Sequence, residues 1–514
     1  MQQNYPVIIC GAGPTGLMLA AQLLRFNIDF LIIDKKSGPT TESRAVVVQA
    51  RSMEIYEQMN LADEIVANAE RTDGICFWRH GKKISEAILK DFGEDITPFD
   101  FILMYEQSKN ETLLYHHLQK NNKEVEWNTE FINYKEGQNE FTVTLKKDDK
   151  DFEVNTKYLV ACDGGKSKVR EVAAMEFSGG TYENVFYVAD THVQANVCTN
   201  KLNFFVANDT FNLLFPMTGE KRFRAIGILP KQFYHQKEIS FNEVSEQVKK
   251  DAELDLGFYN TQWYSTYRLH HRKVASFNKD NIFFCGDAAH VHSPAGGQGM
   301  NTGLQDAYNL AWKLALVIKG EAKKNLLNTY HEERNPVAEN LLKTTDRMFG
   351  LMSQNKTIDV LLRMYLVPFV LPTLMKIKSF RRIFFLLVSQ TEINYEDSSL
   401  AKGRSGKIKA GMRFPYLKLS VNNQIISGFH LIRDNATLPF LMLCYNVNQQ
   451  QVPAYDFIKN IIIERNDFND KALIKANFPS SFYCLLRPDN YIGYIDTSFN
   501  AEEFNNYIYS FMNH

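Results

Sequence analysis

The chain opens with a change of hydrophobic period that is typical of a parallel sheet covered by helices. An uninterrupted apolar run covers residues 5–10, apolar positions then recur with a helical period over 17–26, and a second apolar run covers 28–33. Two further short apolar runs, 158–162 and 281–285, also have the pattern of buried strands. We therefore predict an α/β fold with a parallel sheet, in which ligands bind at the carboxyl ends of the strands.

The middle of the chain has a different period. Apolar and polar residues alternate in short runs separated by polar turns, at 185–193, 202–206, 210–215 and 223–229. This pattern predicts a mostly antiparallel sheet inserted into the α/β fold.

The remainder of the chain combines helices with a second series of short strands. Residues 329–349 are predicted to be helical, and the basic, apolar stretch 358–388 is predicted to form helices that cover the protein. After residue 403 we expect strands at 411–419, 428–432 and 438–445, then the LLRPDNYIGYI segment and a terminal helix after Ser498. The predicted parts are 1–178 (with 72–104 contributing to the inserted sheet), 179–267, 268–345, 346–400 and 401–514.

Composition argues for a small-molecule partner. The 58 basic and 59 acidic residues give a formal charge of −1, which favours neither nucleic acid nor acidic polymers. The seven cysteines are scattered and form no CxxC pair, which argues against a disulfide scaffold and a zinc site and favours a cytoplasmic location. Because charged residues and prolines interrupt the stretch 358–388, membrane contact is expected to be peripheral at most.

The first candidate site lies between the first two predicted strands, in the sequence GAGPTG at 11–16. Gly11 permits a tight turn, Gly13 lets the backbone approach a pyrophosphate, and Gly16 lets helix and strand pack closely. An acid at the end of the second strand can accept hydrogen bonds from ribose hydroxyls. We expect dinucleotide contacts from Gly11, Gly13, Pro14, Thr15, Gly16, Asp34 and Lys35.

Two later segments also place a glycine and an acid at the end of a predicted strand. The predicted strands 158–162 and 281–285 end at Asp163-Gly164 and at Gly286-Asp287, which brings two more carboxylates to the same edge. A glycine-rich loop at 295–299 then begins a predicted helix, whose free N–H groups favour an electron-rich ligand.

Together the motifs GAGPTG, DGGKSKVR, GDAAH and PAGGQGMN resemble those of the class A FAD-dependent aromatic hydroxylases, the family of para-hydroxybenzoate and phenol hydroxylases and of polyketide and antibiotic monooxygenases. The resemblance implies a Rossmann-like FAD-binding domain, non-covalent FAD, NADPH or NADH as co-substrate, and O2. It implies hydroxylation of an aromatic, phenolic or polyketide-like molecule through a flavin 4a-hydroperoxide. It also implies a thioredoxin-like C-terminal domain, here with an RPDxY element that begins at Arg487, and a monomer or homodimer.

The resemblance also assigns residues. Arg44 would lie beside the flavin and the pyridine nucleotide, Gln107 would contact FAD, and Pro294 and Gly297 would act with Arg44 at the reacting ring. The other implied FAD contacts are Asp163, Gly286, Asp287, Gly299, Met300 and Asn301, and the candidate substrate-pocket residues are Trp78, Phe204, Phe205, Phe215 and Met217.

Several alternatives remain open at this level. Arg44 and Gln107 also fit ordinary surface contacts, and half of the apolar strand residues are expected to be plain core. His290 and His292 lie near Asp287, but no third metal ligand is recognisable. An FAD-dependent dehydrogenase or reductase, or a non-catalytic nucleotide-binding protein, would use the same scaffold. Bound FAD after purification would argue against a non-catalytic protein. Incorporation of oxygen into a product would distinguish a monooxygenase from a dehydrogenase.

Overall fold

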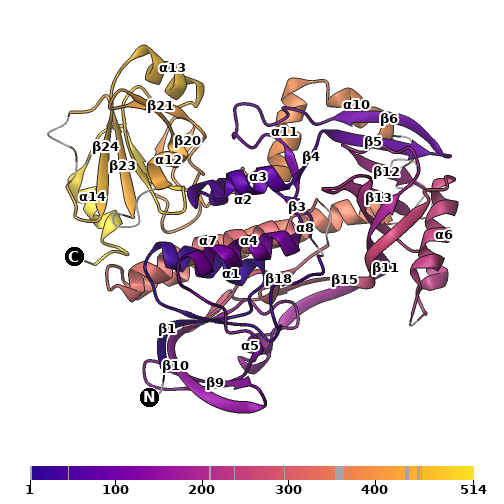
Figure 1. The fold of residues 1–514 in the computed structure, drawn as a ribbon. Coiled ribbons are helices and arrows are strands. Elements are labelled where there is room, and N and C mark those ends of the chain that lie inside the picture. Colours follow the sequence, from indigo (N-terminus) through magenta and orange to yellow (C-terminus); the bar gives the residue numbers. More distant parts are fainter. Residues whose placement is uncertain are drawn as a thin grey trace.

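In a computed structural model of the chain, the described residues form three larger sheets, of seven, eight and four strands, and long helices lie between them (Figure 1). The structure describes residues 3–43, 45–207, 210–236, 238–293, 296–353, 364, 366–433, 439–448, 452 and 454–513.

The first sheet has the parallel core that the opening pattern predicts. Its order is β16-β17-β10-β1-β2, and β8 and β9 form a hairpin attached to β10. The strands are β1 (Gln3–Cys10), β2 (Leu31–Ile33), β8 (Thr129–Glu136), β9 (Phe141–Lys147), β10 (Lys150–Ala161), β16 (Asn278–Lys279) and β17 (Ile282–Phe284). Cys10 pairs with both Ala161 and Ile33, and Ala161 pairs with Phe284, so the four parallel strands end at one edge.

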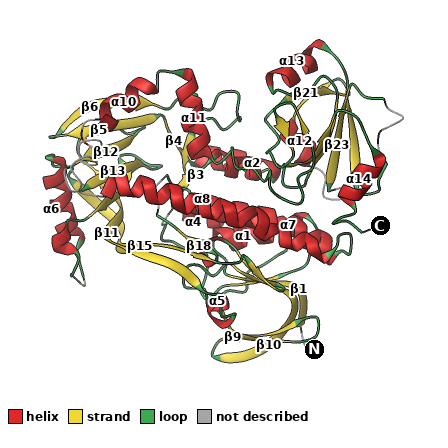
Figure 2. Ribbon diagram, turned by 180° about the vertical axis from the view of Figure 1, so that it is seen from behind, coloured by secondary structure: helices red, strands yellow, loops and turns green. Residues whose placement is uncertain are grey.

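Helices lie beside this sheet and in the middle of the molecule (Figures 1 and 2). They are α1 (Pro14–Arg25), α2 (Ala50–Gln58), α3 (Ala62–Asn68), α4 (Gln107–Lys120), α5 (Lys168–Val172), α7 (Gly299–Ile318) and α8 (Asn328–Ser353). The predicted helix 329–349 is confirmed as α8. From Asn301 to Leu316 every residue of α7 is buried, as expected of a helix that is covered on all sides.

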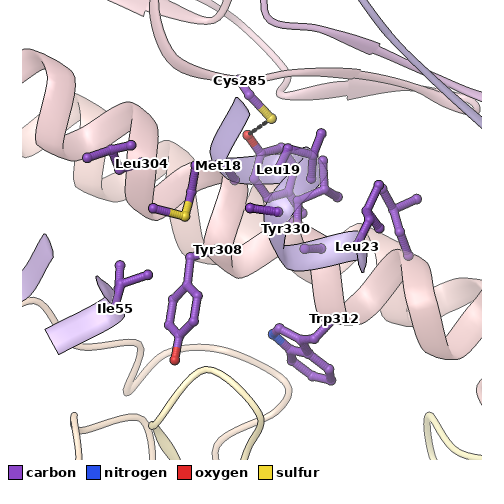
Figure 3. Packing of buried hydrophobic residues seen from close by; sticks show 14 of the residues in the cluster. Met18, Leu19, Leu23, Ile55, Cys285, Leu304, Tyr308, Trp312 and Tyr330 are labelled. Carbon is purple, nitrogen blue, oxygen red and sulfur yellow. Dashed lines mark hydrogen bonds between the residues drawn. The ribbon is translucent and has the colours of Figure 1, made fainter. Parts of the chain in front are cut away.

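The central core is formed where α1, α2, α7 and α8 meet (Figure 3). Met18, Leu19 and Leu23 of α1 face Leu304, Tyr308 and Trp312 of α7. The Tyr330 hydroxyl of α8 donates to the Phe284 carbonyl at 2.8 Å, which ties the end of β17 to this core.

The second sheet is antiparallel except where β5 pairs with β12. Its order is β18-β15-β11-β14-β13-β12-β5-β6. The strands are β5 (Gly74–Arg79), β6 (Lys82–Ile88), β11 (Phe177–Val193), β12 (Leu202–Val206), β13 (Phe211–Pro216), β14 (Arg222–Ile228), β15 (Phe258–Val274) and β18 (His290–Val291), and α6 (Phe241–Ala252) covers one face. A smaller sheet of β3 (Val47–Val48), β7 (Ile102–Met104) and β4 (Glu70–Thr72) lies between the two larger ones.

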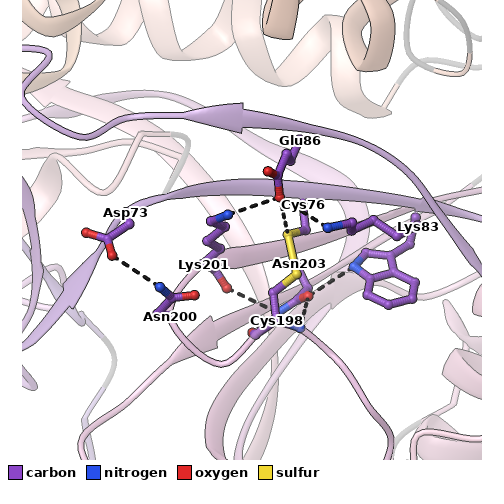
Figure 4. Close-up of a disulfide and its surroundings, with 9 residues drawn as sticks. Asp73, Cys76, Lys83, Glu86, Cys198, Asn200, Lys201 and Asn203 are labelled. Atoms are coloured by element: carbon purple, nitrogen blue, oxygen red, sulfur yellow. Dashed lines mark hydrogen bonds and ion pairs between the residues drawn. A yellow bond between two sulfur atoms is a disulfide. The ribbon is translucent and has the colours of Figure 1, made fainter.

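One feature of the cysteines was not predicted from the sequence. Cys76 and Cys198 form a disulfide that joins β5 to the loop before β12 (Figure 4). The two residues are 122 positions apart in the sequence, and only the pairing of β5 with β12 brings them together. Spacing along the chain gives no sign of this pair.

The C-terminal part contains a four-stranded sheet of order β24-β23-β25-β26, with β23 and β24 parallel and the other pairs antiparallel. Its elements are β19 (Arg404–Ser405), β20 (Ile408–Lys409), β21 (Lys418–Val421), β22 (Gln424–Ser427), α12 (Gly428–Arg433), β23 (Phe440–Tyr445), β24 (Ile458–Ile463), α13 (Asp467–Lys475), β25 (Phe482–Leu486), β26 (Ile492–Asp496) and α14 (Ala501–Ile508). The predicted terminal helix is confirmed as α14.

Two strands predicted in this part are wrong. Residues 428–432 belong to α12, and β21 begins only at Lys418 rather than near 411. An apolar run as short as 428–432 does not distinguish strand from helix. Here packing against α2 decides, since α12 contacts that helix.

The apolar, basic segment forms two short helices, α10 (Val367–Leu374) and α11 (Lys378–Ser389). Helix α10 lies against β6, the edge strand of the second sheet, and α11 packs on the loop at Phe92 (Figure 1). No helix among the described residues is both long and apolar enough to span a bilayer.

Candidate functional site

The turn after β1 is shaped by glycine. Gly11 has φ +106°, and a Cβ there would lie 2.3 Å from the Cys162 carbonyl oxygen. A Cβ on Gly16 would lie 1.9 Å from the Gly11 carbonyl oxygen. A Cβ on Gly13, in contrast, would meet no atom within 4 Å, so Gly13 marks the open side of the turn.

The helix that follows presents donors to that open side. Gly13 is the N-cap of α1 without a side-chain cap, Pro14 begins the helix, and the first turn has no acid. The first N–H groups of such a helix favour an anion such as a pyrophosphate. Thr15 lies beside them and packs closely on the neighbouring loop and on α7, since a Cβ on Gly286 or Gly303 would lie 2.6 or 2.3 Å from its hydroxyl.

Asp34 ends β2 at the same edge and is half-buried. It accepts hydrogen bonds from the Ala12 N–H at 2.7 Å and the Lys36 N–H at 2.9 Å. The carboxylate therefore stabilises the glycine turn itself. Lys35 is exposed.

The DG and GD segments are linked to each other. Asp163 accepts from the Lys168 and Val169 N–H groups through Oδ2, while its buried Oδ1 finds no partner among the described residues. Burial raises the pKa of this carboxyl. Arg170 donates to the Ala288 carbonyl at 3.0 Å, which ties the two loops together, and Asp287 is exposed at the edge.

The loop before α7 approaches β3 closely. Gly297 has φ +64°, and a Cβ on it would lie 2.9 Å from the Val47 Cβ. Asn301 is fully buried and donates to the carbonyls of Val47 and Gly297, both at 2.9 Å. Its Oδ1 accepts from the Gln49 N–H and the Ser52 hydroxyl, so the side chain is saturated within the protein. Only the backbone of Asn301 remains for a ligand.

The first turn of α7 also has no side-chain cap and no acid, so the N–H groups of Gly299, Met300 and Asn301 are free of helical partners. His292 lies beside them, with Nδ1 donating to the Ser293 carbonyl at 2.6 Å. A Cβ on Gly299 would lie 3.5 Å from its Nε2, which is buried without a partner among the described residues. Burial lowers the pKa of His292 to about 4.

Gln107 is the first residue of α4, and its Oε1 accepts from the Ala45 N–H at 3.3 Å. Its amide nitrogen donates to Glu111 at 3.0 Å. The side chain thus lies next to the position expected to contact the ring, but Arg44 itself lies outside the described residues, as does Pro294.

His290 has a partner that the sequence did not reveal. Its Nε2 lies 2.8 Å from Asp306, which also accepts from the Gly286 N–H at 3.0 Å and from Arg334 at 2.7 Å. Asp306 of α7 therefore fixes the GD loop. No group of metal-ligating side chains occurs in the described part of the chain.

The second sheet faces this edge with a polar pair that the sequence analysis missed. Arg224 is fully buried, forms two 2.7 Å bonds with Asp190, and donates to the Ala45 carbonyl at 3.1 Å. Arg222 pairs similarly with Glu106, the N-cap of α4. The sequence did contain an indication of these arginines, because the two of them interrupt the otherwise apolar strand β14.

The five candidate pocket residues divide between the two faces of this sheet. Trp78 stacks on Phe205 at 5.6 Å and belongs to the core covered by α6. Phe215 lies on the opposite face, where it packs against Val47 and Met104. Phe204 shares that opposite face through Phe211, and Met217 is buried after the end of β13.

The half-exposed apolar residues on the face of Phe215 were not singled out from the sequence. They are Leu213, Ile226, Trp263 and Tyr267. Together with Phe215 and the Arg224–Asp190 pair they form what we call the inner face of the second sheet.

These features fit FAD. Two uncapped helix N-termini, the open space at Gly13, the exposed Asp287 and the orphaned acceptors of Asp163 and His292 occur at the carboxyl edge of a parallel sheet. A dinucleotide supplies phosphates for the helix ends and hydroxyls for the carboxylates.

Comparisons with known proteins agree with this chemistry. A family model described as "FAD binding domain" matches residues 4–345. Pentachlorophenol 4-monooxygenase of Sphingobium chlorophenolicum is 28% identical over 95% of this chain and 93% of its own. 6-methylpretetramide 4-monooxygenase of Streptomyces rimosus is 29% identical over 95% of this chain and 90% of its own.

Among solved structures, OxyS anhydrotetracycline hydroxylase from Streptomyces rimosus superposes with a TM-score of 0.81 at 24% identity, covering 99% of both chains. That similarity establishes a mixed α/β hydroxylase fold over the whole length. Because the family model covers about two thirds of the chain, the chain belongs to the family of proteins that contain this FAD binding domain, and it is an FAD-dependent monooxygenase.

Proposed function

We propose that the protein holds FAD non-covalently along the carboxyl edge of the first sheet and uses it, with NADPH or NADH and O2, to hydroxylate a phenolic or polyketide-like aromatic molecule. The observation that carries the proposal is that two uncapped helix N-termini, those of α1 and α7, belong to the loops at this edge, and that the α7 loop contacts the β3 strand on which Phe215 of the inner face packs. Bound FAD would take a hydride from the nicotinamide and activate oxygen.

Different residues at the edge would contact different parts of the cofactor. The N–H groups around Gly13, Pro14, Thr15 and Gly16 would hold the pyrophosphate, and Asp287 the ribityl hydroxyls. The N–H groups of Gly299, Met300 and Asn301 would face the electron-rich edge of the ring, where negative charge develops on reduction.

The remaining assigned residues would shape these contacts. Gly11, Asp34, Asp163 and Gly286 would form the turns, and Lys35 would lie near the ribose end. Gln107, Arg44, Pro294 and Gly297 would lie around the reacting ring.

The substrate would lie between the ring and the inner face. Phe204, Phe215 and Met217 remain candidates there, together with Leu213, Ile226, Trp263 and Tyr267. Trp78 and Phe205 are set aside, because they pack under α6 on the other face. Arg224 would hold the Ala45 backbone, and with it the neighbouring arginine, in a fixed position relative to the substrate. A closed apolar site of this kind excludes water from the reactive flavin.

We further propose that the chain divides at the predicted boundaries, 1–178, 179–267, 268–345, 346–400 and 401–514, with the second sheet continuing to the end of β15. A thioredoxin-like C-terminal domain is supported by its strand order, with one parallel and two antiparallel pairs. A monomer or homodimer in the cytoplasm, where NAD(P)H is available, completes the proposal.

The proposal is tested with purified protein and a panel of phenols and polycyclic aromatics. We expect a yellow protein with about one FAD per chain, and a product that gains one oxygen atom from 18O2. Protein that remains colourless after incubation with FAD contradicts the cofactor assignment. A product that is oxidised but contains no oxygen atom from 18O2 would instead indicate a dehydrogenase.

Gating is tested by stopped-flow reduction. We expect a true substrate to accelerate flavin reduction by NAD(P)H, because reduction without substrate leads to wasteful release of hydrogen peroxide. A substrate that is hydroxylated with full coupling but leaves the reduction rate unchanged would contradict gating, while the monooxygenase assignment would stand.

A further inference from the structure

Exposed apolar side chains gather in one segment of the protein. Fifteen large apolar residues of the described chain are exposed, and seven of them lie between residues 366 and 387. They are Leu366 (48%), Val367 (38%), Phe369 (48%), Val370 (38%), Ile377 (50%), Ile383 (65%) and Leu387 (49%). Single exposed apolar residues are ordinary on proteins, but seven within 22 residues indicate an interaction surface. We call these seven residues the α10–α11 surface.

The helices that carry this surface are anchored from beneath. Phe385 is buried and packs edge-on against Phe92 at 4.8 Å, and a Cβ on Gly93 would lie 2.5 Å from its ring. The Ser85 hydroxyl donates to the Pro368 carbonyl. The exposed side chains therefore belong to helices that already have an inner packing face.

The charge of the segment is one-sided. Residues 366–389 contain Lys376, Lys378, Arg381 and Arg382 and no aspartate or glutamate. Among the described residues only Lys378 of these four forms an ion pair, with Glu94 at 3.6 Å.

Carboxylates from the neighbouring loop offset only part of this charge. Besides Glu94, Asp95 interacts electrostatically with Lys378 and Arg382, but its own ion-pair partner is Lys475, at 2.7 Å. The surface thus combines exposed apolar side chains with an excess of positive charge.

This combination selects one partner. A second copy of the chain, joined through the same surface by a twofold axis, would bring one excess of positive charge close to another and is disfavoured. A bilayer with anionic headgroups accepts both features at once, because apolar side chains enter the headgroup boundary while lysine and arginine side chains reach the phosphates. We propose that the α10–α11 surface binds reversibly to the surface of an anionic lipid bilayer.

The location of the surface connects it to the cofactor edge. Gln298, in the loop before α7, donates to the Leu387 carbonyl at 3.4 Å, and Gln390, just after α11, contacts Gln305 and Thr302 of α7. A bilayer bound here would therefore lie close to the loop before α7. Lipid binding itself is a property of the surface and does not depend on the proposed hydroxylation.

The test is cosedimentation of the FAD-loaded protein with large vesicles. We expect at least tenfold stronger partitioning to vesicles containing about 30% phosphatidylglycerol than to pure phosphatidylcholine, with most of the difference lost in 0.5 M NaCl, since salt screens exposed charges. Ile383→Glu combined with Leu387→Glu should weaken binding at least tenfold. Arg382→Glu should reduce the preference for anionic vesicles.

Ile474→Glu is the matched control, because Ile474 is 72% exposed on α13, outside the α10–α11 surface. This variant should bind vesicles like the wild type, and all variants should keep their FAD content and melting temperature. Wild-type protein that does not sediment with anionic vesicles overturns the proposal, as does unchanged binding of the double variant. A wild-type dimer that the double variant converts to a monomer, without vesicle binding, would identify the surface as a homodimer interface instead.

Discussion

Helix α7 takes part in two polar regions that are built in opposite ways. At its first turn the N–H groups are free, the N-cap offers no side-chain bond, and the nearby Asp287 is exposed. Further along, the side chains of Trp312 and Lys313 enter a cluster in which each charge has a buried partner.

The second region joins the C-terminal part to the rest of the protein. Arg487, 1% exposed, forms bonds of 2.6 and 3.0 Å to Glu333 of α8 and bonds of 3.0 and 2.5 Å to Asp489. Burial alone would raise the pKa of Glu333, but Arg487 and Lys313 hold it well below its ordinary value. Arg51 of α2 completes the contact by donating to the Asp489 carbonyl at 2.9 Å.

The difference teaches how to separate a ligand site from a structural site on one helix. Buried charges that saturate one another leave nothing for a ligand, and they are costly to break. Free helix donors beside exposed carboxylates are stable only because water or a ligand satisfies them. Substitutions in the two regions should therefore differ in what they change.

The largest effect is expected from Arg487→Ala. Removing the guanidinium leaves Asp489 buried without its cation and Glu333 with Lys313 alone, which should cost about 3–5 kcal/mol of unfolding free energy. We expect a large fall in the melting temperature of both apo and FAD-loaded protein, measured by differential scanning fluorimetry. Arg404→Ala, an exposed arginine of the same part of the chain, should have little effect. Equal melting temperatures for the two variants would contradict the structural role of the cluster.

Asp287→Ala should act on the cofactor rather than on the fold. The loss of a charged acceptor should weaken FAD binding by about 2 kcal/mol, or roughly thirtyfold, as measured by titration of the apoprotein. The apoprotein should melt like the wild type, because Asp287 is exposed. Glu171→Ala removes another exposed carboxylate, from α5, and should leave FAD affinity unchanged. Wild-type affinity in Asp287→Ala would place this residue outside the site.

Gly297→Ala should have a smaller effect on the same region. Its φ of +64° and the 2.9 Å approach to the Val47 Cβ mean that a methyl group both strains the backbone and displaces β3. Strain of about 1–2 kcal/mol is expected, with up to roughly tenfold weaker FAD binding and more hydrogen peroxide released per NAD(P)H.

Gly320→Ala is the control for Gly297→Ala. Gly320 has φ +75° after the other end of α7, and a Cβ there meets no atom within 4 Å. It should lose similar stability but keep its FAD affinity and coupling. If both variants lose FAD affinity equally, the close approach at Gly297 has no special importance.

The parts of the fold that could be predicted from the sequence are those specified locally. The GAGPTG turn predicts its own helix, since glycine spacing and the following period lie within about 20 residues of one another. The strands β12, β13 and β14 follow from clear alternation, with boundaries shifted by one residue at most.

The rest depends on partners that are distant in the sequence. Nothing near Arg224 indicates Asp190, and nothing near Arg487 indicates Glu333, because sheet pairing and helix packing create both contacts. Asn301 illustrates the same limit within the candidate site. Its motif predicted a cofactor contact, whereas its side chain is saturated by Val47, Gly297, Gln49 and Ser52.

The smallest effect on catalysis is expected from Cys444→Ala combined with Cys484→Ala. Both thiols are free and fully buried on adjacent strands of the C-terminal sheet, and burial raises the pKa of Cys444 to about 12. A thiol that remains protonated at neutral pH is a poor nucleophile, so this sheet has no redox pair despite its strand order. Turnover per bound FAD should match the wild type, the melting temperature should fall because core volume is lost, and iodoacetamide should not label either cysteine in the native wild type. A large loss of turnover in a variant that keeps its FAD would mean that the C-terminal region contributes chemistry. That result would contradict the purely structural role that the contrast along α7 gives to this region.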